Sequence, residues 1–195
     1  MIKTYISPAL NEKEILRYAR SSENALPAEA INAINILPET TVGRVVFDIF
    51  EIENRGDILD LGFAKTTSKN LKKNLEGCNK IVLFAATAGI EFDRLIKKYE
   101  RVSPSKALWY QSIGSAYVES VCDIFCEEIT REYGKTKPRF SPGYGDLPIE
   151  MQRDIFSALG CEKNIGITLN DSFFMTPSKS VTAIIGICEQ QKGKF

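Results

Sequence analysis

The stretch Arg139-Phe-Ser-Pro-Gly-Tyr-Gly-Asp-Leu-Pro148 is the most informative part of this sequence. Pro142 fixes its own φ and restricts the residue before it, while Gly143 can adopt φ values closed to other residues. Such a turn lets the main chain approach a ligand and holds Tyr144 in a fixed direction. Arg139 can bind a carboxylate or phosphate through two parallel hydrogen bonds. The stretch therefore indicates a site for a small ligand with a carboxylate at one end and a flat ring at the other. The alternative is a surface loop with a solvated arginine and a tyrosine packed on the core.

Helical and strand patterns are mixed along the chain. The longest helical pattern runs from Ser103 to Tyr133, and its uncharged centre, 107–118, is expected to cross the core. Further helices are predicted at 11–20, 27–37, 68–75, 89–100 and 149–159, and strands at 42–53, 58–63, 79–87, 165–169 and 181–188. The turn 54–57 is expected to join the first two strands as a hairpin. Because the order does not alternate strictly, we predict one α+β domain over 1–195, with a mostly antiparallel, twisted sheet covered by helices.

Several short segments follow one another in a recognisable order. They are Arg139-x-x-x-Gly143-Tyr144, Gly166-x-x-Leu169, Ser172-Phe-x-Met175 and Pro177-x-x-Ser180-Val181. This order resembles the activation domain of cobalamin-dependent methionine synthase, the module that binds S-adenosylmethionine. The resemblance is strong over 139–187 and extends more weakly back to about residue 80, through Thr87–Asp93. One departure is Gly145-Asp146-Leu147, where the large enzymes of the family have Pro-Ala-Cys.

Composition argues against several classes of partner. The net charge is zero, from 25 acidic and 25 basic residues, and no sustained basic stripe is present, so no nucleic acid partner is expected. The densest basic cluster, Lys69, Lys72 and Lys73, is interpreted as a solvated helix face. No segment approaches the ~20 apolar residues of a membrane span. The N-terminus also lacks the apolar run of a secretory signal, so we expect a cytoplasmic protein without a membrane partner.

Cysteine and histidine usage limits the chemistry. The five cysteines form no Cys-x-x-Cys pair, which favours reduced thiols over a disulfide framework or a zinc site. Histidine is absent, which excludes Ser-His and Cys-His nucleophile pairs and His-ligated metals. The chain also has no imidazole to offer to cobalt. These features favour binding over catalysis, and no catalytic or metal-ligating residue is expected.

Two acids on the long helix are candidates for contact with the positive groups of the ligand. Glu119 and Asp123 are four residues apart and therefore share a helix face. The resemblance implies an acid on this helix, and Asp123 is the best correspondence. The alternative is a solvated face that continues into Glu127 and Glu128. Asp93, on the helix after Gly89, is interpreted as a solvated or turn-stabilising acid.

The resemblance also implies main-chain contacts to the adenosine from the last strand. The corresponding positions are Ile185 and Gly186, although the aromatic side chains of the family are missing there. The complete set of expected ligand-binding residues is Arg139, Ser141, Gly143, Tyr144, Glu119, Asp123, Ile185 and Gly186.

The function implied by the resemblance is that of an S-adenosylmethionine-binding activation subunit. Such a subunit supports the reductive methylation that reactivates cobalamin in a separate methionine synthase. Cobalamin would be carried by the methionine synthase core, and electrons would come from a donor such as a flavodoxin-type protein. The chain itself would be an accessory component, not an independent enzyme. The alternative is a corrinoid-protein docking scaffold that has lost S-adenosylmethionine binding. An independent methyltransferase is disfavoured, because no Gly-rich loop follows a first strand.

Overall fold

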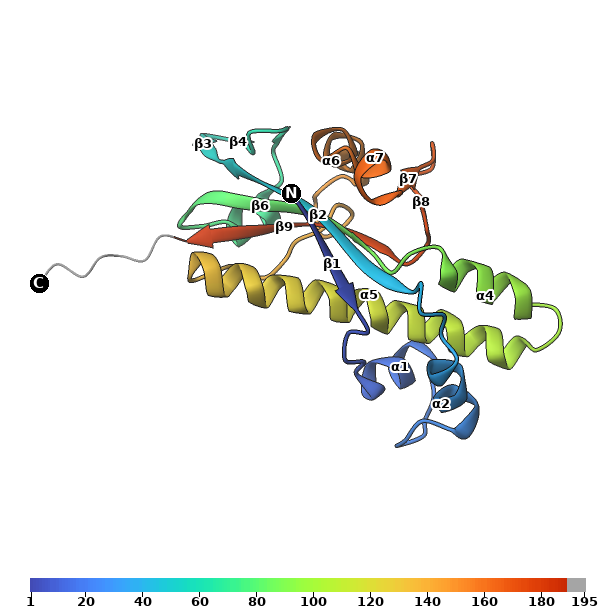
Figure 1. The fold of residues 1–195 in the computed structure, drawn as a ribbon. Helices are drawn as coiled ribbons and strands as arrows, with labels where there is room; N and C mark the ends of the chain where they lie inside the picture. The colour runs from blue at the N-terminus through green and yellow to red at the C-terminus, as the bar shows by residue number, and fades with distance from the viewer. Residues whose placement is uncertain (189–195) are drawn as a thin grey trace, which may run out of the picture.

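The centre of the molecule is a four-stranded antiparallel sheet in the order β1-β2-β6-β9 (Figure 1). The computed structural model describes residues 1–188, so the last seven positions of the predicted domain lie outside it. The strands are β1 (Ile2–Ile6), β2 (Val42–Glu51), β6 (Cys78–Thr87) and β9 (Ser180–Cys188). The predicted α+β class with a mostly antiparallel sheet is confirmed.

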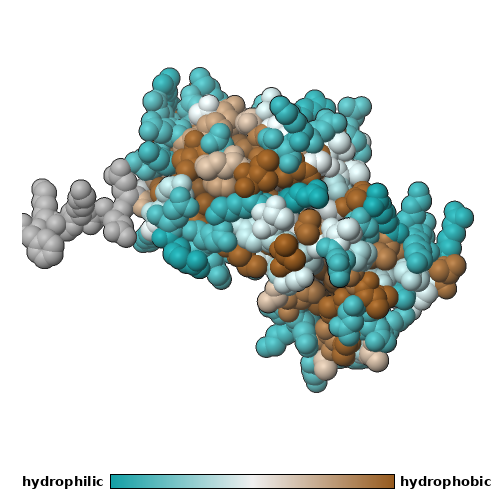
Figure 2. All heavy atoms as spheres, viewed as in Figure 1, coloured by the Kyte–Doolittle hydropathy of each residue, from teal (hydrophilic) through white to brown (hydrophobic). Residues whose placement is uncertain are grey.

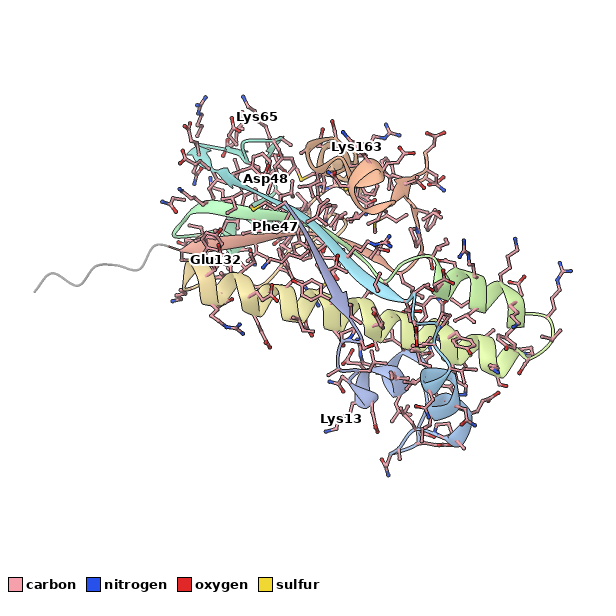
Figure 3. All side chains as sticks on the ribbon, viewed as in Figure 1. Lys13, Phe47, Asp48, Lys65, Glu132 and Lys163 are labelled. Atoms are coloured by element: carbon pink, nitrogen blue, oxygen red, sulfur yellow. The ribbon has the colours of Figure 1, made fainter. Side chains whose placement is uncertain are left out.

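One face of the sheet is covered by helix α5 (Pro104–Tyr133), and helices α1 (Glu12–Tyr18), α2 (Ala28–Asn35) and α4 (Glu91–Tyr99) pack against α5 (Figure 1). Helix α5 lies across this face (Figure 1), and most of its uncharged centre is buried as predicted, although Leu108 and Gln111 are exposed. Phe47 and Asp48 follow each other on β2 and point to opposite sides of the sheet (Figure 3). The Phe47 ring lies 5.1 Å from that of Phe125 on α5, centroid to centroid, so strand alternation builds this core layer.

The opposite face carries shorter elements. These are α3 (Lys69–Asn74), the 3₁₀ turn η1 (Ile149–Met151), α6 (Gln152–Leu159) and α7 (Cys161–Ile165). Two small sheets accompany them: β3 (Glu53–Arg55), β4 (Ile58–Asp60) and β5 (Lys65–Thr66) form one, and β7 (Thr168–Leu169) and β8 (Met175–Thr176) form the other. The chain thus forms three layers with the sheet in the middle, and each face of the sheet has its own apolar core.

The predicted hairpin around 54–57 is confirmed in part, because β3 and β4 pair antiparallel across it, but the second strand ends at Asp60 and the pair lies in a small sheet with β5, separate from β2. Other details of the secondary structure were predicted wrongly. The predicted strand 165–169 is wrong at its start, because Ile165 ends α7 and Gly166 adopts a left-handed φ of 72° before the two-residue β7. Strand β1 was missed, and its alternation of exposed and half-buried residues explains why, since an edge strand buries little apolar surface.

Asp93 stabilises the turn that precedes β9, and Lys179 is a buried charge in that turn. The Asp93 carboxylate accepts hydrogen bonds from the Ser178 main-chain N–H at 3.1 and 3.3 Å, so its turn-stabilising role is confirmed. Lys179 is only 6% exposed, and its Nζ donates to Ser115 Oγ at 3.1 Å. Burial lowers the pKa of Lys179, and the charge of Asp93 offsets part of that effect.

Among residues 1–188, no helix combines the length and apolar character that crossing a bilayer requires.

Candidate functional site

Arg139 is placed by a segment that extends the central sheet. Residues 135–140 run antiparallel along the outer edge of β9, with bridges from Thr136 to Ile187 and from Phe140 to Ile184. Phe140 and Ile184 exchange two main-chain hydrogen bonds of 2.8 Å, and the Cys188 N–H donates to the Lys135 carbonyl at 2.9 Å. Because side chains alternate along an extended segment, Arg139 faces α5 while Phe140 packs against the opposite core.

The Arg139 guanidinium lies against the two acids predicted on the long helix. Its Nη2 donates to Glu119 Oε2 and lies 3.4 Å from Asp123 Oδ1. The side chains of Arg139 and Glu119 are 27% and 29% exposed, while that of Asp123 is 68% exposed. The structure therefore brings Arg139, Glu119 and Asp123 together in one cluster, which we call the charge cluster.

One donor of this guanidinium remains unused. Arg139 Nη1 is buried and has no hydrogen-bond partner among residues 1–188. Burial by itself lowers the pKa of Arg139, but the surrounding groups on α5 outweigh that effect, so the net pKa is raised and the side chain stays charged. A buried charged donor without an acceptor is costly, so this position favours an incoming carboxylate or carbonyl oxygen.

The turn after Arg139 has the conformation that its sequence predicts. Gly143 adopts a φ of 88°, and its N–H donates to the Leu147 carbonyl at 2.9 Å. Ser141 accepts at its carbonyl from the Tyr144 N–H at 3.1 Å, which closes the turn. Tyr144 is 61% exposed, and its ring centroid lies 6.2 Å from that of Phe140. The aromatic ring is thus presented at the surface from a hydrogen-bonded turn.

Asp146, in the segment that departs from the family pattern, fastens this turn to α3. Its carboxylate accepts from the main-chain N–H groups of Lys69 and Asn70, at 2.8 and 3.1 Å, and from the Ser68 hydroxyl. The Ser68 hydroxyl oxygen in turn accepts from the Leu71 N–H at 3.0 Å. Hydrogen bonds from Ser68 and from the α3 N–H groups lower the pKa of Asp146. Sequence reasoning missed this role; the available signal was the serine before a short helix, which is typical of an N-cap.

Ile185 and Gly186 lie on β9, beside the segment that carries Arg139. Ile185 is 1% exposed and belongs to the core beneath α5. The Gly186 carbonyl accepts from the Lys137 N–H at 2.8 Å, so the added edge segment already uses it. A Cβ at Gly186 would lie 2.7 Å from Cys78 Sγ and 2.8 Å from Leu75 Cδ2. Close packing inside the protein therefore accounts for this glycine. Among the predicted ligand-binding residues, the structure brings Glu119, Asp123 and Arg139 together.

A cavity of about 600 Å³ lies elsewhere, between the N-terminal helices and α5. It is bordered by Leu26, Ile34, Thr41 and Tyr117 among others, and by none of the residues predicted to bind the ligand. Figure 2 shows apolar side chains gathered at the surface around α1 and α2. The charge cluster and Tyr144 are thus separate from this cavity.

Comparison with known proteins gives the fold and the family. The crystal structure of the MetH reactivation domain bound to AdoHcy has a similar fold, with a TM-score of 0.71 over 100% of this chain and 80% of that chain. The two sequences are 17% identical, so this likeness concerns the fold alone. No curated protein matches the sequence. Residues 68–192, more than half of the chain, match the family described as vitamin B12 dependent methionine synthase, activation domain. The chain therefore belongs to the activation-domain family of vitamin B12-dependent methionine synthase.

Proposed function

We propose that this protein is an S-adenosylmethionine-binding activation subunit that supports the reactivation of cobalamin in a separate methionine synthase. The observation that carries the proposal is the charge cluster, in which Arg139 Nη1 is buried beside Glu119 and Asp123 and finds no acceptor in the described part of the chain. The family and the fold agree with this function, and AdoHcy, bound by the similar MetH domain, is the demethylated form of the proposed ligand.

The charges of the cluster complement those of the ligand's amino-acid end. Arg139, Glu119 and Asp123 together carry one net negative charge at neutral pH. The corresponding part of S-adenosylmethionine carries a carboxylate, an ammonium and a sulfonium, which together make one net positive charge. Arg139 would hold the carboxylate through Nη1, and the two acids would face the positive groups.

The turn next to the cluster would hold the rest of the ligand. Ser141 and Gly143 bring main chain near Arg139, and the exposed ring of Tyr144 offers a flat apolar surface to the nucleoside. When bound, S-adenosylmethionine supplies the methyl group that cobalamin receives after reduction. The residues of this chain bind and orient the ligand, and none of them needs to act as a general base.

Other proteins would carry the cobalamin and supply the electrons. The proposed partners are the cobalamin-binding methionine synthase core and a flavodoxin-type reductant. The docking surface would lie around Tyr144, because the bound methyl group must reach the partner's cofactor.

Isothermal titration calorimetry with S-adenosylmethionine tests the assignment. We expect saturable heat for the wild type, its loss in Arg139→Ala, and its retention in Arg94→Ala. Arg94 is a matched control, since it also pairs with a carboxylate, Glu91 at 2.8 Å, but lies on α4. Unchanged binding in Arg139→Ala would contradict the proposed role of this residue.

The docking scaffold without a ligand is the second candidate. It is favoured by the ion pair that Arg139 already makes with Glu119 and by the engaged carbonyl of Gly186. Under this alternative, equilibrium dialysis with labelled S-adenosylmethionine retains no label on the wild type, while the protein still associates with a cobalamin-binding methionine synthase core.

A further inference from the structure

Two cysteines distant in sequence meet on adjacent strands. Cys78 on β6 and Cys188 on β9 are register partners in the antiparallel ladder, and their Sγ atoms are 2.9 Å apart. Regular strand partners have Cα atoms about 4.5–5.5 Å apart, within the range of about 4.4–6.8 Å that a disulfide spans. The register shifts between Cys78 and Lys80, but the two sulfur atoms still meet. Both thiols are free. An S–S bond between them therefore requires little movement of the main chain.

The neighbourhood holds the two thiols in this arrangement. Gly186 leaves room for the Cys78 thiol, because a Cβ there would lie 2.7 Å from its sulfur. Cys188 is fixed on its other side by the hydrogen bond from its N–H to the Lys135 carbonyl. The space at Gly186 and the hydrogen bond of Cys188 therefore help to hold the two sulfur atoms close together.

A cavity gives access to one thiol of the pair. Cys78 is half-buried and lines a cavity of about 430 Å³, while Cys188 is only 8% exposed. Lys69, Lys72 and Lys73 line the same cavity, with Glu76 as its acid, so its charged side chains sum to a positive value. Lys69 and Lys73 are exposed, in agreement with the predicted solvated face, and all three lysines border the cavity that Cys78 also lines. A positive entrance favours an anionic reagent.

We propose that Cys78 and Cys188 form a reversible disulfide by exchange with an anionic low-molecular-weight disulfide of the glutathione type. The Cys78 thiolate attacks one sulfur of that disulfide, which forms a mixed disulfide and releases one thiolate. The Cys188 thiolate then attacks the Cys78 sulfur and releases the second. The two protein thiols lose two electrons and two protons, and the reagent leaves as two thiols. Burial, and then the contact with Cys188, raises the pKa of Cys78 to about 12, so the exchange is slow at neutral pH and faster as pH rises.

The test exposes the complete protein to glutathione disulfide between about pH 7 and 9 and follows intact mass and cysteine cross-links. We expect the wild type and Cys126→Ser, a half-buried control, to lose two hydrogens and to yield a Cys78–Cys188 cross-linked peptide. The early rate is expected to rise about tenfold per pH unit. Cys188→Ser is expected to stop at one glutathione adduct on Cys78. A wild type that keeps its mass, or that stays as a single adduct, would overturn the proposal.

A second comparison tests the class of reagent. The double variant Lys69→Gln/Lys73→Gln is expected to react about tenfold more slowly than wild type with glutathione disulfide at low salt. With the uncharged bis(2-hydroxyethyl) disulfide, its rate is expected to equal that of the wild type. Equal slowing with both reagents would overturn the assignment of an anionic substrate.

Discussion

Removal of the Ser68 hydroxyl should loosen the turn that presents Tyr144. Ser68 is 3% exposed, and its oxygen accepts from the Leu71 N–H while its proton goes to Asp146. Ser68→Ala therefore leaves one helix N–H without its acceptor and removes one of the hydrogen bonds that fasten the turn to α3.

The expected cost follows from this geometry. Loss of an N-cap serine typically lowers the free energy of unfolding by about 1 kcal/mol, within roughly 0.5–2 kcal/mol. We expect the upper half of that range, about 1–2 kcal/mol, because the site is buried and the hydroxyl also serves a carboxylate. For a domain of this size, that loss lowers Tm by about 2–8 °C.

Thermal and urea unfolding of Ser68→Ala measure this cost, with Ser21→Ala as the control. Ser21 also accepts a local hydrogen bond, from the Glu23 N–H at 3.2 Å, but lies in an exposed segment. We expect the control to change stability by less than about 0.5 kcal/mol. If Ser68→Ala costs no more than Ser21→Ala, the fastening of the turn to α3 through Ser68 is refuted.

Three further changes test other parts of the structure. The folded pKa of Asp146 is lowered, so its stabilising effect is present above its unfolded pKa and is lost as pH falls through the folded value. Below about pH 5, the free energy of unfolding should therefore fall less steeply with pH in Asp146→Asn than in the wild type. Lys179→Met should raise the free energy of unfolding at neutral pH by roughly 1 kcal/mol. Because the folded state binds the lysine proton more weakly than the unfolded state does, this gain should shrink toward about pH 10, which urea unfolding at several pH values measures. Asp123→Asn should weaken S-adenosylmethionine by about fivefold in calorimetry and S-adenosylhomocysteine by less, because only the former carries the sulfonium charge; equal losses would refute the pairing of Asp123 with that charge.

The sequence was sufficient for those parts of the fold in which local signals and burial agree. Helix α5 spans Pro104–Tyr133, with proline in its first turn and Gly134 after its end, as predicted. The local hairpin of 53–55 with 58–60 followed from its turn, but its separation from β2 in a small sheet did not, because the grouping of strands depends on contacts across the fold. Strand β1 was hidden by its position at the edge, where few of its side chains are buried.

The members of the charge cluster were predictable from their own chemistry, but their direct ion pairing was not predicted. The helical spacing of Glu119 and Asp123 placed them on one face, and the motif supplied Arg139. What the sequence could not give was the register of 135–140 against β9, which leaves Ile185 in the core and engages the Gly186 carbonyl. The contact of Cys78 with Cys188 was hidden for the same reason, since 109 residues separate them and only strand pairing brings them together.

The extended path of residues 135–140 restricts which length changes this region can accept. Between its two bridges this segment takes four steps, from Thr136 to Phe140, whereas β9 takes three, from Ile187 to Ile184, so the segment already holds one extra residue. Length changes before Arg139 can therefore be absorbed upstream of the Phe140–Ile184 bridge, while a residue added between Arg139 and Phe140 would turn the guanidinium away from Glu119. Among relatives that keep the ion pair, we therefore expect the arginine to stay directly before the paired residue, while its distance from the end of α5 varies.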